Sequence, residues 1–215
     1  MAIIYPRETP GRAFQSVDFK LLEIAVLNTL QNGAIQTMDL GPSLWRAEFT
    51  TIPLYPEERG AWQAWAMSLR GGRNFVAHDP EKVYPAAYGK DALALSRAIG
   101  GAFDGTASLA AFTATTIQLM GLPAGYQATS GDMLSFPWNG LQALHQVVED
   151  AAANSSGIVT LNVGPPVLTN PAPTVGATVT LIRPVCVMKI VPGSFEAPAS
   201  PIPTPVRFQG VQAIA

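Results

Sequence analysis

The sequence contains little charge. Only 13% of its 215 residues are Asp, Glu, Lys or Arg, about half of the roughly 25% that is typical of globular proteins. Soluble monomers usually have a well-charged surface, so this composition predicts that identical or different partners cover much of the exterior. The 13 basic residues are scattered and the net charge is −2, which excludes the basic patch that specific nucleic-acid binding requires.

Cysteine and histidine are also scarce, with one and two copies. Cys186 has no partner for an internal disulfide, and its apolar neighbours predict a buried thiol in a strand. His78 lies beside Asp79 without a candidate nucleophile, and His145 is predicted to lie on the polar face of a strand. We therefore expect no catalytic residue, no metal site and no cofactor, and we interpret the chain as a protein that is not an enzyme.

Long hydrophobic runs are missing as well. No apolar segment follows Met1, and no later stretch has the length and composition of a membrane span, so we expect synthesis in the cytoplasm and no membrane insertion. In contrast, 48% of the residues are hydrophobic, which is ample for a core. The 19 glycines and 19 prolines predict many turns.

One amphipathic helix stands out, over residues 56–70. It begins with Pro56, which suits the first helical position, continues with two acidic residues that complement the helix dipole, and ends before a Gly-Gly pair. Trp62, Trp65 and Leu69 share one of its faces. Such a large apolar stripe predicts packing against the chain's own sheet or against a neighbouring subunit.

The rest of the pattern predicts a mainly β protein built from antiparallel β-sandwich or barrel modules. Alternation over residues 14–54 indicates antiparallel strands, and Trp45 begins the last apolar face. We interpret residues 1–122 as an N-terminal sheet module, residues 123–195 as a small barrel or sandwich, and residues 196–215 as an extended Pro-rich arm.

Local signals add detail to this pattern. A change of parity at Leu21-Leu22 predicts a β-bulge. Gln31-Asn32-Gly33 predicts a turn, and Asn139-Gly140 predicts a tight hairpin turn. The Ala- and Gly-rich segment 91–108 has no clear period, so we expect a long surface excursion there.

The C-terminal segment combines prolines with apolar residues. Repeated Pro between Glu196 and Val206 opposes a regular strand ladder. The segment nevertheless has four apolar side chains that favour burial over exposure to solvent: Phe195, Ile202, Val206 and Phe208. The sequence thus predicts an arm that leaves its own subunit and lies across a neighbour.

Short motifs follow one another in a defined order along the chain. In the first half they read as strand, aromatic helix, glycine turn, strand and loop: Leu44–Phe49, Glu58–Trp65, Leu69–Phe75 and Asp79-Pro80. In the second half they read as strands and turns: Gly131–Phe136, Leu144–Asp150, Gly157–Leu161, Gly164–Leu168 and Arg183–Ile190. Over residues 15–191 this order resembles the distal tail proteins of long-tailed siphophages and related gene-transfer particles.

The resemblance implies a structural virion protein at the tail tip, made in the cytoplasm of a host bacterium. Such proteins form a homo-hexameric ring that joins the tail tube to the hub and carries receptor-binding parts. DNA would pass through the ring without specific binding, with which the mild acidity is compatible. Two alternatives stay open, namely a carbohydrate-binding β-sandwich module and a trimeric hub or minor tail protein.

Overall fold

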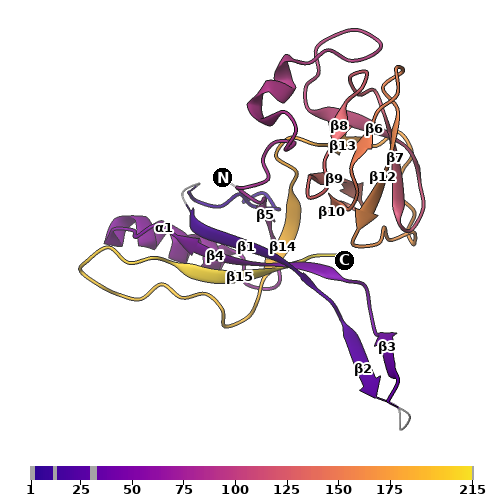
Figure 1. Cartoon of the computed structure of the whole chain (residues 1–215). Helices are drawn as coiled ribbons and strands as arrows, with labels where there is room; N and C mark the ends of the chain where they lie inside the picture. The colour runs from indigo at the N-terminus through magenta and orange to yellow at the C-terminus, as the bar shows by residue number, and fades with distance from the viewer. Residues whose placement is uncertain (1–2, 12–13, 30–32, 215) are drawn as a thin grey trace.

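The computed structural model describes residues 3–11, 14–29 and 33–214, and it contains two lobes (Figure 1). We call them the sheet lobe and the barrel lobe. Antiparallel sheets and one closed barrel dominate the described residues, which confirms the predicted mainly β fold with a short α-helix. Neither helix in this part of the chain combines the length and apolar character that crossing a bilayer requires.

The sheet lobe contains a five-stranded antiparallel sheet. Its strands follow in the order β1 (Phe14–Leu22), β4 (Leu44–Thr51), β15 (Arg207–Gln212), β14 (Cys186–Ile190) and β5 (Asn74–Ala77). Helix α1 (Pro56–Ser68) packs its tryptophans on one face of this sheet. A separate hairpin of β2 (Ala25–Thr29) and β3 (Ile35–Asp39) projects from the end of the sheet between β1 and β4 (Figure 1).

Helix α1 forms where the local signals predict it. Pro56 occupies the first turn, and the carboxylate of Glu58 accepts a hydrogen bond of 2.9 Å from the backbone N–H of Tyr55. Leu69 caps the last turn, and Gly71 adopts a φ of 83° that stops the helix. The predicted range of 56–70 is thus confirmed to within two residues.

The barrel lobe is a closed six-stranded barrel. Its strands follow in the order β10 (Leu141–Val147), β12 (Val159–Gly164), β7 (Thr116–Met120), β6 (Thr106–Phe112), β13 (Thr178–Thr180) and β9 (Met133–Trp138). Two short strands, β8 (Gln127–Ala128) and β11 (Ala151–Ala152), pair beside it. Asn139 and Gly140 have φ values of 48° and 73°, so the predicted tight turn between β9 and β10 is confirmed.

The barrel is an insertion in the sheet lobe, between β5 and β14. Strands β6 and β7 therefore belong to the barrel, whereas β14 and β15 return to the sheet. These boundaries differ from the sequence division at residues 122 and 195, because pairing between distant strands leaves no local signal. The segment 91–108 is also shorter than expected as an excursion, since it holds part of the 3-10 helix η1 (Gly89–Ala94) and the start of β6.

The predicted bulge at Leu21-Leu22 is wrong. Strand β1 pairs with β4 in continuous register from Ser16 to Leu22, and the irregularity lies between Phe14 and Ser16. The parity changes near Leu22 because the chain leaves the sheet there and enters the β2–β3 hairpin. Of the turn predicted for that hairpin, Gln31 and Asn32 lie outside the described residues.

The two lobes share a packed interface. The indole N–H of Trp45 in β4 donates a hydrogen bond of 2.8 Å to the carbonyl of Leu144 in β10. Met133 and Leu144, both from the barrel, are buried within the hydrophobic core of the sheet lobe. The barrel is thus held against the sheet by a buried polar contact as well as by apolar packing.

Candidate assembly site

The tryptophan stripe of α1 belongs to the chain's own core. Trp62, Trp65 and Leu69 are 5% exposed or less, and Trp45 joins them from β4. The two α1 indoles lie 5.5 Å apart and both contact Phe208. The sequence left two packing partners open for this stripe, the chain's own sheet and a neighbouring subunit. In the structure the stripe packs against the chain's own sheet.

The C-terminal segment also folds back on its own subunit. Val206 and Phe208 are fully buried in the sheet lobe, and Phe195 is half-buried. Ile202 alone among these four apolar side chains is largely exposed, at 67%. The predicted extended arm is therefore wrong for residues 207–212, which form β15 at the centre of the sheet and satisfy its ladder hydrogen bonds there.

Arg59 holds the Pro-rich segment in place. This buried side chain donates hydrogen bonds to the hydroxyl of Thr204 at 2.8 Å, to the carbonyl of Ile202 at 3.2 Å and to the carbonyl of Ser200. Sequence reasoning missed this role, although one signal was present. A cation in the first turn of a helix opposes the helix dipole, so it needs other partners to compensate.

The β2–β3 hairpin carries several exposed apolar side chains. Leu27 and Ile35 are 70% and 71% exposed, and Met38 is 58% exposed. Figure 1 shows the hairpin extending away from both lobes. A two-stranded hairpin is marginally stable by itself in water, so this element gains most from burial against another surface.

The register of the hairpin shows which side chains lie together. Val26 pairs with Met38, and the N–H of Leu40 bonds to the carbonyl of Ile24, so these four residues share one face. Leu27 lies on the opposite face. The sequence predicted strands here but no exposed apolar surface. The signal for that surface was a pair of strands with apolar residues on both faces.

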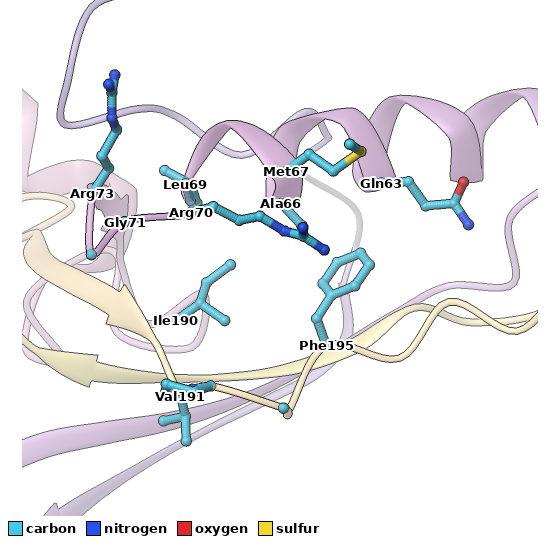
Figure 2. A pocket seen from close by; sticks show the side chains of 13 residues that line it. Gln63, Ala66, Met67, Leu69, Arg70, Gly71, Arg73, Ile190, Val191 and Phe195 are labelled. Atoms are coloured by element: carbon cyan, nitrogen blue, oxygen red, sulfur yellow. The ribbon is translucent and has the colours of Figure 1, made fainter.

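A groove lies on the sheet lobe between α1 and the β14–β15 connection (Figure 2). Its volume is about 640 Å³, and its apolar lining includes Met67, Ile190 and Phe195. Arg70 extends along the groove toward Phe195, whereas Arg73 stacks on the Tyr5 ring at 4.6 Å. No Asp or Glu lines the groove.

His145 lies in the barrel interior rather than on a polar face. Its ring stacks on Phe136 with centroids 5.3 Å apart, and Nδ1 lies 2.8 Å from the carbonyl of Pro165. Burial lowers the pKa of His145 to about 4, so the imidazole is neutral at physiological pH. The predicted polar-face position is wrong because the sheet lobe, not solvent, covers the outer face of β10.

Other side chains that could carry chemistry are buried or hydrogen-bonded within the fold. Cys186 is fully buried in β14, as its apolar neighbours predict, and burial raises the pKa of its thiol. Asp104 accepts hydrogen bonds from Thr106 and Arg97, and the Thr106 hydroxyl lowers the pKa of that carboxyl. Asp79, beside His78, accepts a hydrogen bond from the N–H of Glu81.

The described residues contain no group of three or more His, Cys, Asp or Glu side chains that could hold a metal ion. No protein-family model and no curated protein matches this chain. The hairpin and the groove are two separate surface features of the sheet lobe.

Proposed function

We propose that this protein is a structural subunit that assembles with copies of itself into a ring at the distal end of a phage tail. The observation that carries the proposal is the β2–β3 hairpin, on which Leu27, Ile35 and Met38 are 58–71% exposed in the isolated chain. Exposed apolar patches of this kind mark protein interaction surfaces. The low charge of the whole chain, 13%, supports the same interpretation.

The ring in this proposal is homo-hexameric and lies between the tail tube and the hub, in keeping with the resemblance to distal tail proteins. A closed ring requires head-to-tail contacts, in which one surface meets a different surface of the next subunit. The hairpin and the body of the sheet lobe offer two different surfaces for such a contact. A net charge of −2 suits a channel through which DNA moves without binding.

The carbohydrate-binding alternative gains no support from the tryptophans. Sugar-binding modules present exposed aromatic rings, but all four tryptophans are 8% exposed or less. Trp138, the tryptophan of the barrel, is buried and donates a hydrogen bond to the carbonyl of Pro171. A trimeric hub subunit remains as the second stoichiometry that the assembly experiment distinguishes.

Mass measurement and electron microscopy of the purified protein test the proposal. We expect the parent to form a closed ring of six copies at high concentration and Leu27→Asp to remain a folded monomer, because a carboxylate replaces an apolar contact. Val148→Asp, at a 57% exposed site on the barrel, is the matched control and should leave the ring intact. A parent that stays monomeric in solution and forms no cyclic assembly at the tail tip refutes the proposal.

A further inference from the structure

We infer that the groove between α1 and the β14–β15 connection is the acceptor site for the β2–β3 hairpin of a neighbouring copy of this chain. This inference rests on the proposed ring and names the two surfaces that meet in it. The groove residues that matter are Met67, Arg70, Ile190 and Phe195.

The chemistry of the two surfaces is complementary. The groove has an apolar lining with arginines and no carboxylate. The segment from Leu21 to Trp45, which contains the hairpin, includes two acidic residues and no Lys or Arg. Glu23 is exposed at the base of the hairpin, so its carboxylate is available to a cation on another subunit.

Arg70 is the cation in question. Within the described residues its guanidinium makes no ion pair and no side-chain hydrogen bond, in contrast to Arg73, which lies over Tyr5. Figure 2 shows the Arg70 side chain lying along the groove. A guanidinium on an apolar surface is well suited to pair with a carboxylate, because it offers several donors in one plane.

The hairpin extends away from the sheet lobe (Figure 1), whereas the groove lies on the lobe itself, between α1 and the β14–β15 connection. The hairpin leaves the sheet beside the Leu22–Leu44 pair, whereas Ile190 of the groove pairs with Gly210, which in turn pairs with Ala47 in the middle of β4. Two different surfaces on the same subunit are what a head-to-tail contact requires.

The volume of the groove also falls in the range of small-ligand pockets. A small ligand in the groove would leave the exposed apolar side chains of the hairpin unexplained, however. A hairpin from a neighbouring copy accounts for the hairpin and the groove with one contact. We therefore favour the second copy. If the groove serves a small apolar anion instead, the cross-linking test below should give no product above its control.

Disulfide trapping between two variants tests the contact. Leu27→Cys and Met67→Cys change residues that are 70% and 63% exposed, so neither variant should unfold. When the two are produced together and oxidised, we expect cross-linked dimers that join one copy of each variant. Leu27→Cys paired with Val148→Cys, on the barrel, is the control and should give at least tenfold less product.

Charge reversal adds a second readout. Arg70→Glu should raise the concentration needed for assembly at least tenfold, about 1.4 kcal/mol, and lower the cross-link yield with the fold unchanged. A ring that forms while the Leu27–Met67 pair gives no more product than the control overturns the inference but not the ring. An unchanged ring in Arg70→Glu overturns the role of this cation, and a parent that forms no ring refutes the proposed function itself.

Discussion

Replacing Trp65 with Ala tests how the sheet lobe is held together. The indole is 1% exposed, and its ring lies 5.3 to 5.5 Å from those of Phe208, Phe75 and Trp62. Removing a buried Trp from such a site costs about 3–5 kcal/mol, because the lost apolar contacts leave a cavity. The indole N–H also donates to the carbonyl of Glu8 at 2.9 Å.

The lost hydrogen bond adds little to this cost. Glu8 is exposed, so water can replace the indole as donor to its carbonyl, and a net loss of about 1 kcal/mol is an upper value. Trp65→Phe separates the two contributions, because it keeps most of the ring packing and removes the donor. We expect it to lose clearly less stability than Trp65→Ala.

Urea unfolding followed by circular dichroism, at a concentration where the protein is monomeric, measures these differences. A loss of about 4 kcal/mol corresponds to a fall in Tm of roughly 8–16 °C for a chain of this length. Met67→Ala, on the same helix but 63% exposed, is the control and should change stability by about 0.5 kcal/mol at most. If Trp65→Ala behaves like this control, the aromatic cluster is not the core of the sheet lobe and our reasoning is wrong.

Three further predictions address the C-terminal segment, pH and barrel closure. Arg59→Ala should expose residues 196–206 to limited proteolysis, because it removes the donors that hold them, and unchanged cleavage contradicts that role. Stability should fall by about 1.4 kcal/mol per pH unit as pH drops from 6.5 to about 4, since the unfolded chain protonates His145 first; His145→Gln should flatten this slope. Gly157→Ala should destabilise the barrel far more than Gly176→Ala in thermal melts, because both have positive φ but only at the former would a Cβ meet backbone, at 2.1 Å; equal losses contradict this.

The sequence predicts the elements whose signals are local. Helix α1 carries its start, its stop and its buried face within about 15 residues, and Asn139-Gly140 specifies a hairpin turn through two positive φ angles. In both cases the backbone preference and the apolar pattern agree. The structure matches these predictions closely for that reason.

The failures concern contacts between distant residues. Strand β15 pairs with β4 across more than 150 residues, and no local pattern separates such a return from an extended arm. Leu144 and His145 show a second cause of failure. Alternation of apolar and polar residues defines two faces of a strand but does not show which face is buried. The sheet lobe covers Leu144, so the polar-looking His145 is the one that faces the barrel interior.

The barrel takes no part in the proposed subunit contact. Both surfaces of the proposed subunit contact lie on the sheet lobe, and no barrel residue lines the groove or belongs to the hairpin. The barrel is inserted between β5 and β14 and held by the contact of Trp45 with Leu144. Its outward loops are therefore free to differ without altering either surface, so the proposed ring would hold the barrels in fixed positions while the sheet lobes alone determine its symmetry.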